Sequence, residues 1–391
     1  MINAKDDISA ISATDRRWAW VEVDLNAIRH NIKETRKLIG PNTKVMAVVK
    51  ADGYGHGAVQ VARTALNSGA MYLGVATIDE AVELREAGIN EPILLLSQPP
   101  ETAIPLLVRY EVMPALYTAE FAIKYGEAAD AQGKLAPYHL AVNTGMNRIG
   151  VNYFEVVEFV SQISFHRALK MEGIFTHFAT ADSPVTFEFE RQLDRFTGVV
   201  YQLKNAGINP GIVHAANSPA TYRFPQARFD MVRVGLSMYG LYPSDDIRQA
   251  IKLIPAMSVR AKITDERIVT MGDGVGYGLN YRARAASKIC TIPIGYDDGL
   301  MRCLSGKISI LYKGRRFAQV GNICMDQCMF EIDMGSAQAQ TTYNAQIGDM
   351  VTIVGADGNE FIGMDELAQT AQTISYELCC GFSHRLPIVY V

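Results

Sequence analysis

The sequence predicts an α/β protein: a (β/α)8 barrel of the TIM type, followed by a mostly antiparallel β domain. Between residues 20 and 240, short apolar or β-branched runs alternate with segments of helical period, which is typical of βα units around a parallel sheet. After about residue 250, apolar residues alternate with polar ones, as in antiparallel strands. A chain of 391 residues has room for both parts, so we assign residues 1–250 to the barrel and residues 251–391 to the second domain.

The barrel prediction depends on eight runs with the length and composition of buried strands. Eight βα units in about 200 residues favour a closed barrel over an open, doubly wound sheet. The runs are VMAVV (45–49), YLGV (72–75), ILLL (93–96), VMPAL (112–116), YHLAV (138–142), GIFTH (173–177), IVHA (212–215) and MVRV (231–234).

Amphipathic segments between these runs predict helices. The segment 77–88 opens with acidic residues, which suit the start of a helix, and it ends on glycine; the segment 203–208 has the same glycine stop. An earlier helix is predicted to begin after Asp24, a favourable N-cap, with Leu25, Ile28 and Ile32 on one face.

In the second domain we predict five strands and one helical segment near residues 364–378. The assignment leaves room for residues 1–20 to extend onto this domain. The predicted strands are MSVRAKI, ASKICTIPI, GKISILY, DMVTIVG and LPIVYV.

Composition excludes several classes of partner. With 49% hydrophobic residues, 20% charged residues and a formal net charge of -4, the chain has no electrostatic footprint for nucleic acid or a membrane surface. The first 17 residues carry charges where a signal peptide needs an apolar core, so we expect a cytoplasmic protein. The six cysteines lack the C-x2-C spacing of a zinc site; we expect buried thiols and no metal.

Polar residues follow the predicted strands at the end where barrel enzymes carry their reacting groups. Lys50 stops the first strand, ahead of a glycine-rich loop; it is either a side chain that extends to solvent or a partly desolvated amine able to form a Schiff base. Ser218 and the amides near Gly235 lie where a barrel holds phosphate. The other residues in such positions are Asn143, Thr144, Arg148, His177, Asn217 and Arg233.

These residues belong to blocks that resemble the alanine racemases, barrel enzymes that use pyridoxal 5'-phosphate (PLP). The resemblance covers almost the whole chain, with the blocks in the same order. They are AVVKADGYGHG, THFATAD, HAANS, RVGLSMYG, GYGLNY, IPIGYDDG, GNICMDQ and ISYEL. The resemblance implies an isomerase that interconverts L-alanine and D-alanine.

The family's roles carry over to matching positions. Lys50 and Tyr277 would be the two catalytic acid/base residues, because racemisation removes a proton from one face of a planar carbanion and returns one to the other. The resemblance implies that PLP is bound by Lys50, Tyr54, His177, Asn217, Ser218, Arg233, Gly235, Leu236 and Tyr376. It implies that the substrate is bound by Arg148, Met325, Tyr296 and Arg302.

In the family, the second acid/base comes from the C-terminal domain of another subunit. The resemblance therefore implies a head-to-tail homodimer with shared active sites, a small amino-acid substrate, and D-alanine for the peptidoglycan of the cell wall as the product.

The run after the fifth predicted strand departs from the family pattern. Many alanine racemases read K-x-D-T-G-M-x-R, with the lysine carbamylated to position the arginine, whereas Ala141 and Asn143 replace the lysine and the aspartate here. We expect Arg148 to be buried and oriented by Asn143 or by a bound anion instead.

An Ala-x-Asn run at this place also resembles the broad-specificity amino-acid racemases, which accept lysine and arginine. Those relatives are typically exported, and Tyr376 stands where it would crowd the substrate methyl group, so we favour alanine. More remote alternatives are a non-catalytic PLP-binding protein, a PLP-dependent decarboxylase and a PLP-independent barrel enzyme.

Overall fold

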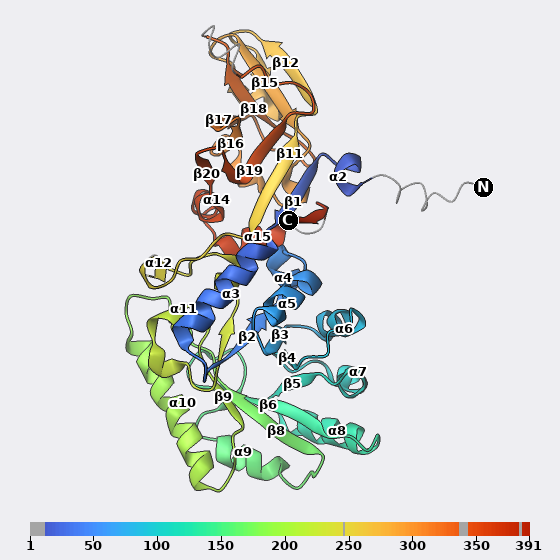
Figure 1. Cartoon of the computed structure of the whole chain (residues 1–391), viewed down its shortest axis with the longest axis vertical. Helices are drawn as coiled ribbons and strands as arrows, with labels where there is room; N and C mark the ends of the chain where they lie inside the picture. The colour runs from blue at the N-terminus through green and yellow to red at the C-terminus, as the bar shows by residue number, and fades with distance from the viewer. Residues whose placement is uncertain (1–11, 245–246, 336–342, 383–384) are drawn as a thin grey trace, which may run out of the picture. The chain divides into compact units, whose positions relative to one another are not determined.

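The computed structural model describes residues 12–244, 247–335, 343–382 and 385–391. Contacts divide the chain into two compact units, both drawn in Figure 1. The barrel unit is Asn26–Ile254, and the C-terminal unit comprises the described residues up to Leu25 together with Pro255–Val391.

Eight parallel strands close into a barrel in the first unit. Each strand pairs in parallel with the next one around the ring, and β10 pairs with β2 to close it. The predicted (β/α)8 barrel is confirmed, and each predicted run overlaps one strand. The strands are β2 (Lys44–Val48), β3 (Tyr72–Val75), β4 (Ile93–Leu95), β5 (Met113–Leu116), β6 (Ala136–Asn143), β8 (Leu169–Phe175), β9 (Ile212–His214) and β10 (Met231–Val234); β7 (Val151–Asn152) pairs with β6.

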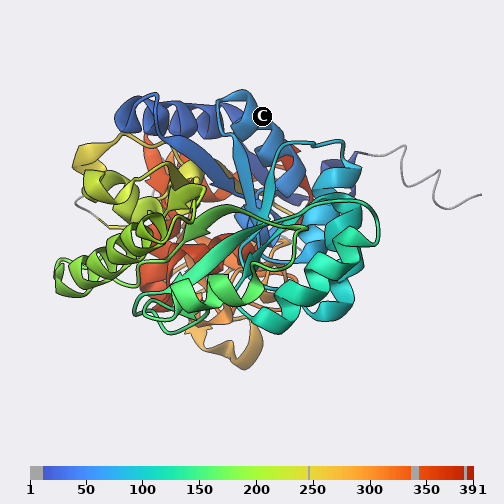
Figure 2. The same cartoon turned by 90° about the horizontal axis from the view of Figure 1, so that it is seen from below.

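Helices cover the outside of the barrel strands (Figure 2). The first begins at Leu25, directly after the predicted cap residue Asp24. Another begins with a capping box in which Thr77 and Glu80 each accept the other's backbone N–H, as its acidic first turn suggests. In the described part of the chain, no helix has the length and apolar character needed to cross a membrane. The helices are α3 (Leu25–Ile39), α5 (Ala58–Asn67), α6 (Ile78–Glu86), α7 (Ile104–Tyr110), α8 (Ala119–Asp130), α9 (Val156–Ile163), α10 (Phe187–Asn205), α11 (Ser218–Arg223) and α12 (Ile247–Ala250), with 3-10 turns η1 (Glu101–Ala103), η2 (Pro225–Ala227) and η3 (Leu236–Tyr239).

Side chains rather than solvent fill part of the barrel interior, as in other barrels of this type. The strands contribute a cluster of buried apolar residues, and the small Ala141 of β6 belongs to it. The members are Met46, Leu94, Met113, Ala115, Ala141, Phe175 and Met231.

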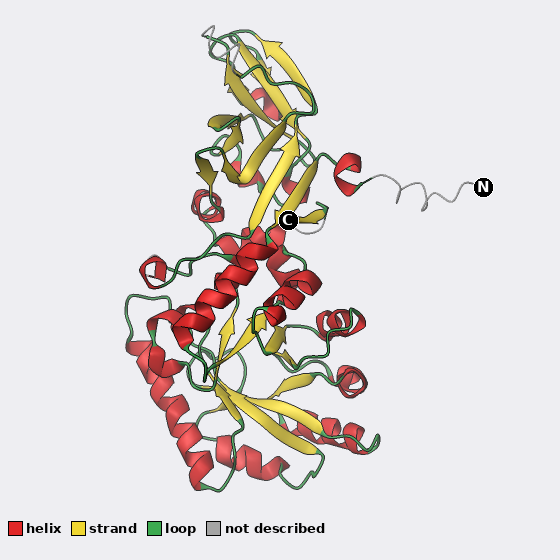
Figure 3. Cartoon of the chain, in the orientation of Figure 1, coloured by secondary structure: helices red, strands yellow, loops and turns green. Residues whose placement is uncertain are grey.

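The C-terminal unit is a β sheet that includes the N-terminal strand β1 (Figure 3). The order is β12-β15-β18-β17-β16-β19-β11-β1-β21, with β20 paired to β19 and a separate β13–β14 hairpin. The pairs are antiparallel except for β1 with β21, so the predicted antiparallel character is confirmed. The strands are β1 (Ala19–Val23), β11 (Met257–Lys262), β12 (Asp265–Val269), β13 (Gly274–Val275), β14 (Tyr281–Arg282), β15 (Ser287–Ile292), β16 (Ser309–Tyr312), β17 (Arg315–Val320), β18 (Cys328–Asp333), β19 (Met350–Asp357), β20 (Glu360–Ile362) and β21 (Ile388–Tyr390).

The helical segment predicted near residues 364–378 is two helices instead of one. α14 (Met364–Ala371) stops at Gln372, whose left-handed backbone (φ 58°) ends it, and α15 (Ser375–Gly381) begins three residues later. Helical period continues across the break in the sequence, so the pattern alone could not reveal it. The unit also contains α2 (Ala13–Arg16) and the 3-10 turns η4 (Tyr277–Leu279), η5 (Tyr296–Asp298) and η6 (Arg302–Leu304).

The cysteines are unpaired thiols, and not all of them are buried. Cys290, Cys328 and Cys379 are buried, and burial raises the pKa of the Cys290 thiol to about 12. Cys303 is exposed on η6, so the expectation of buried thiols is wrong for this residue.

Candidate active site

A left-handed turn carries Lys50 at the carboxyl end of the first barrel strand. β2 ends at Val48, and the next helical turn, α4 (Lys50–Gly55), has positive φ at Ala51 (51°), Asp52 (50°), Gly53 (60°) and Tyr54 (55°). A left-handed conformation costs an L-residue about 1–2 kcal/mol. Three non-glycine residues in this state mean that the surrounding structure must hold the turn, a condition found often at functional sites.

Side chains from neighbouring segments supply that support. Glu80, in the first turn of α6, accepts from the N–H of Ala51 through Oε1 (2.7 Å) and from the N–H of Ala76 through Oε2 (2.7 Å). Asp52 accepts from the N–H of Ala58, the first residue of α5 (2.7 Å). These bonds fix the backbone on both sides of the turn, so Lys50 has a defined place at the barrel mouth.

Hydroxyl and amide groups form a cradle beside this turn. The N–H of Gly235 donates to Ser218 Oγ (3.1 Å), and a Cβ on Gly235 would lie 2.8 Å from Tyr54 Oη. Tyr222 donates to Ser237 (2.8 Å), which donates to Ser218 (3.0 Å). Because Ser218 Oγ accepts from both Ser237 and Gly235, its own hydroxyl hydrogen points away from this chain of donors. The arrangement suits an anion with several oxygens, such as a phosphate group.

Arg233, at the end of β10, is buried among neutral acceptors. Its Nη1 lies 2.9 Å from His214 Nδ1 and its Nη2 lies 3.1 Å from His177 Nδ1. Nη2 also donates to the carbonyl oxygens of Thr176 (2.8 Å) and Ala215 (3.0 Å). A guanidinium can only donate, so both histidines accept through Nδ1 and carry their hydrogen on Nε2. This places a cation, not a carboxylate, at the end of the last strand.

The burial of Arg233 and His177 agrees with this assignment. Burial, with a contribution from the charge of Arg148, lowers the pKa of Arg233 to about 9, so it is still protonated at neutral pH. Burial, together with the charges of Arg233, Arg148 and Lys50, lowers the pKa of His177 to about 3. His177 is therefore neutral, with Arg233 in direct contact and the charges of Arg148 and Lys50 also acting on it.

Two other predicted residues have structural partners that the sequence did not reveal. Asn217 is the N-cap of α11, where its side chain accepts from the N–H of Ala220 (3.2 Å). Leu236 is buried at the start of η3, directly after Gly235. Both residues therefore lie next to the cradle, Asn217 before Ser218 and Leu236 after Gly235.

The expectation that Asn143 orients a buried Arg148 is wrong. Arg148 is exposed in the loop after β6. The Asn143 amide instead bonds its own loop: Oδ1 accepts from the N–H of Gly145 (3.1 Å) and of Asn147 (3.0 Å), and Nδ2 donates to Asn147 and Asn152. Asparagine side chains in loops often form hydrogen bonds with backbone groups two to four residues away. Asn143 does so here, and its hydrogen bonds reach its own loop rather than Arg148.

The remaining predicted residues lie in the C-terminal unit. Tyr277 is 76% exposed and Met325 is 50% exposed. The loop of Tyr296 is joined to that of Met325, because the N–H of Tyr296 donates to Cys324 O (2.9 Å) and that of Asp297 to Met325 O (3.1 Å). Arg302 is exposed on η6 and Tyr376 is half-buried near the start of α15.

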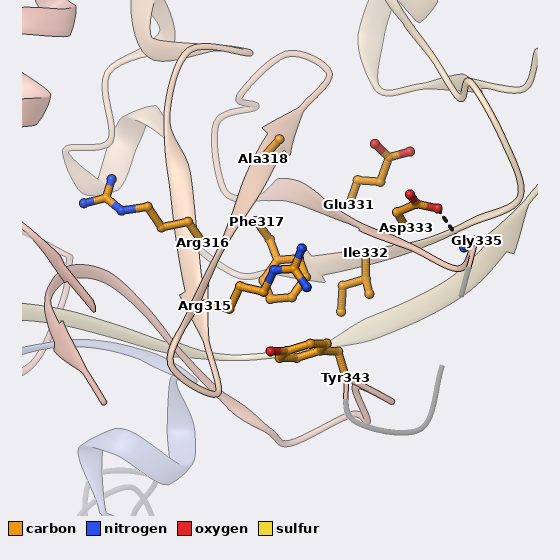
Figure 4. Close-up of a pocket in the computed structure, with 9 residues that line it drawn as sticks. All are labelled: Arg315, Arg316, Phe317, Ala318, Glu331, Ile332, Asp333, Gly335 and Tyr343. Atoms are coloured by element: carbon orange, nitrogen blue, oxygen red, sulfur yellow. Dashed lines mark hydrogen bonds between the residues drawn. The ribbon is translucent and has the colours of Figure 1, made fainter. Parts of the chain in front are cut away.

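A pocket on the C-terminal unit contains none of these residues (Figure 4). The Arg315 guanidinium lies 5.7 Å from the ring centre of Phe317 and 5.3 Å from that of Tyr343, and Asp333 accepts from the N–H of Gly335 (2.8 Å). The arginine is thus held by the two rings, and the pocket adds nothing to the predicted site.

Comparison with known proteins agrees with this geometry. The model of the alanine racemase N-terminal domain matches residues 23–243, and that of the C-terminal domain matches residues 256–390. The chain belongs to the alanine racemase family. The resemblance predicted from its sequence blocks is confirmed.

Relatives in the alanine racemase family match nearly the full length of this member. A curated alanine racemase from Synechocystis sp. is 40% identical over 378 residues, which are 96% of this chain and 100% of that protein. The solved alanine racemase from Bacillus anthracis with bound L-Ala-P has a TM-score of 0.88 at 37% identity and covers 96% of this chain and 95% of its own. A histidine racemase from Leuconostoc mesenteroides has a TM-score of 0.86 at 30% identity and covers 96% and 98%.

Several residues that build this racemase site were not predicted. Ser237 bonds the predicted Ser218, His214 contacts the predicted Arg233, and Glu80 accepts from the N–H of Ala51, the residue after Lys50. His214 and Ser237 stand within blocks that carried the resemblance, which was a usable signal. Glu80 had only its capping-box spacing, which does not reveal the second bond to Ala51.

Proposed function

We propose that this protein is an alanine racemase that works with PLP and interconverts L-alanine and D-alanine. The observation that carries the proposal is a set of three features at the ends of neighbouring barrel strands. They are Lys50 on a strained turn, the cradle of Tyr54, Ser218 and Gly235, and the buried Arg233. An amine, an anion cradle and a hydrogen-bond donor for a ring nitrogen are the groups that PLP needs. Family membership agrees with this combination.

The residues fit PLP in a specific way. Lys50 would hold the cofactor through Nζ, and Tyr54, Ser218 and the Gly235 amide would bind its phosphate. Bound PLP supplies an acceptor for the electron pair that remains at Cα after a proton leaves. Arg233 would donate a hydrogen bond to the ring nitrogen without giving up its proton, because its pKa of about 9 lies well above that of a pyridine-type base.

Racemisation needs an acid/base on each face of the substrate. We assign Lys50 to one face and Tyr277 to the other. We also propose that Met325, Tyr296, Arg302 and Arg148 bind or admit the amino acid. Tyr277 is 76% exposed, so its hydroxyl is accessible to an active site whose other groups come from a barrel.

We also propose that the protein is a homodimer. Two copies would pair head to tail, so that each C-terminal unit completes the barrel site of its partner. Mixing Lys50→Ala chains with Tyr277→Ala chains tests it. Random pairing gives hybrids in half of the dimers, each with one intact site, so roughly a quarter of wild-type activity should return. No recovery after the chains have exchanged would mean that each site is built within one chain.

The activity is tested by chiral analysis of amino acids incubated with purified protein and PLP. L-alanine should yield D-alanine, and Lys50→Ala should lower the rate by at least about a thousandfold, since it removes an acid/base and the covalent link. D-alanine formed in the cytoplasm would supply peptidoglycan synthesis. If the wild-type protein produces no D-alanine, the proposed activity is wrong.

A second candidate is a racemase for larger amino acids. It is favoured by Ala141, which replaces the family's lysine in the barrel interior, and by the similarity to the Leuconostoc histidine racemase. Including L-histidine, L-lysine and L-serine in the same assay decides between them. Turnover of histidine or lysine comparable to that of alanine would establish the broader activity.

A further inference from the structure

A chain of polar side chains crosses the barrel interior behind the proposed cofactor site. His139 on β6 and His214 on β9 are fully buried, and His139 Nδ1 lies 2.8 Å from His214 Nε2. The other ring nitrogen of His214, Nδ1, faces Arg233 Nη1. The chain therefore links Arg233 to His139, a residue with no role in the proposed chemistry so far.

The chemistry of Arg233 fixes the direction of every bond in this chain. A guanidinium only donates, so His214 Nδ1 must accept and His214 must carry its hydrogen on Nε2. That hydrogen then points at His139 Nδ1, which must accept in turn, leaving the His139 hydrogen on Nε2. Burial and the charge of Arg233 lower the pKa of both histidines, so both rings are neutral. Only one pair of tautomers is consistent with these distances.

The fold holds both rings in place. The pairing of β6 with β8 shifts register between Tyr138 and His139, an irregularity that can re-aim a side chain. His139 then faces Gly173, where a Cβ would lie 2.5 Å from the imidazole ring. Phe175 stacks on His214 with ring centres 5.1 Å apart.

Simple core packing does not explain a histidine at position 139. Its Nε2 is buried and has no hydrogen-bond partner among the described residues. A buried polar atom left unpaired destabilises the fold, and an apolar side chain of similar size would avoid that cost. The hydrogen bond that His139 accepts from His214 compensates for this cost. His214 in turn accepts from Arg233, so the effect of His139 reaches the arginine.

We propose that His139 is a positioning residue: by accepting from His214 Nε2 it fixes the His214 ring, so that His214 Nδ1 aims the Arg233 guanidinium at the ring nitrogen of bound PLP. The inference rests on the proposed function in one respect, the identity of the ligand at Arg233. The hydrogen-bond chain itself does not depend on that ligand.

The ring nitrogens of 15N-histidine-labelled protein without PLP test the chain directly by NMR. In the wild type, His139 and His214 should both show the neutral Nε2–H form from pH 5 to pH 8. His139→Leu removes the acceptor, so the His214 nitrogen signals should shift or broaden. His139→Asn places an amide oxygen near the Nδ1 position and should restore them. Unchanged His214 signals in His139→Leu would overturn the proposal.

PLP affinity provides the second readout. His139→Leu should raise the PLP dissociation constant by roughly threefold to tenfold, the effect of one hydrogen bond, whereas His139→Asn should stay near wild type. Leu140→Ala, on the same strand, controls for loosened packing: it should lower stability but leave the His214 signals and PLP affinity unchanged. If Leu140→Ala changes both as much as His139→Leu does, the positioning role is wrong.

Two further outcomes separate the claims. If His139→Leu does not fold, His139→Phe serves instead, because it keeps a planar ring in the space beside Gly173, removes the acceptor and should produce the same shift at His214. If wild-type protein shows the tautomers but does not bind PLP, the chain stands, and the proposed function and the aim at a PLP nitrogen are overturned.

Discussion

Gly235 shows how much the proposed site depends on single residues. Its missing side chain leaves room for the Tyr54 hydroxyl, and its amide stands beside Ser218, the residue that accepts from it. The atom that a Cβ would meet is the far end of a tyrosine, which can move. A substitution here should therefore distort the cradle and leave the fold intact.

Gly235→Ala should raise the PLP dissociation constant by roughly tenfold to a hundredfold, because displacing the Tyr54 hydroxyl would lose a hydrogen bond to a charged group, which costs about 1.5–3 kcal/mol. Titration of the apoprotein with PLP measures it. Gly198→Ala, in the interior of α10 with nothing within 4 Å of its added Cβ, is the matched control. It should stabilise the protein by about 0.5–1 kcal/mol and leave PLP affinity unchanged. Equal affinities in the two variants would contradict the cradle.

The place of a residue in the fold could be predicted from sequence where it ends a strand, and a side chain's partner could not be predicted where it had a choice. Lys50, Ser218 and Arg233 could be named because strand ends and family blocks locate them. Asn143 was misassigned, because an amide can bond either a distant arginine or its own loop, and only the folded loop decides.

At the scale of elements, the left-handed turn α4 differs most from what propensity suggests. Alanine, aspartate and tyrosine rarely adopt positive φ, and nothing in a period-based analysis indicates that they do so here. The strands were predictable because buried parallel strands are continuous apolar runs. The turn depends instead on hydrogen bonds of Ala51 with Glu80 and of Asp52 with Ala58, which follow no periodic pattern in the sequence.

Ala51→Gly should raise the free energy of unfolding by about 0.5–1 kcal/mol, because relief of the left-handed strain exceeds the added entropy of the unfolded chain. Ala51 is exposed, so little packing is lost. Urea unfolding followed by circular dichroism measures the change. Ala128→Gly, within the right-handed helix α8, should instead lower it by about 1 kcal/mol. Destabilisation by both variants would show that the turn is unstrained.

For the whole molecule, the barrel interior implies sensitivity to acid. Burial lowers the pKa of His56 to about 4 and that of His139 and His177 to about 3. These histidines stay neutral in the folded barrel while the unfolded chain takes up protons below about pH 6.5. Their contribution to stability is complete above that pH and is lost as the pH falls toward the folded values.

Between pH 7 and pH 5.5, protonation of each such histidine in the unfolded chain should therefore lower the free energy of unfolding by about 1.3 kcal/mol. Urea unfolding of wild type and His139→Asn at both pH values tests this by circular dichroism, since both tryptophans, Trp18 and Trp20, belong to the C-terminal unit. The free energy of unfolding of the variant should fall by about 1.3 kcal/mol less than that of wild type. Identical losses would mean that His139 is protonated in the folded barrel.

The two-part architecture was visible in the sequence because the apolar period changes near residue 250. The break between α14 and α15 was not visible, since a single left-handed residue, Gln372, interrupts an otherwise helical pattern. The candidate site is built from the ends of several strands. The sequence presents these residues only as a list, whereas the closed barrel brings the strand ends together.

The most direct test of the account is the deuterium content of alanine at early times in deuterated water, starting from L-alanine. Two acid/bases on opposite faces predict that D-alanine carries solvent deuterium at Cα, while the remaining L-alanine is still largely protiated. D-alanine that keeps the proton of its substrate would contradict the account, because one base would then have carried the proton from one face to the other.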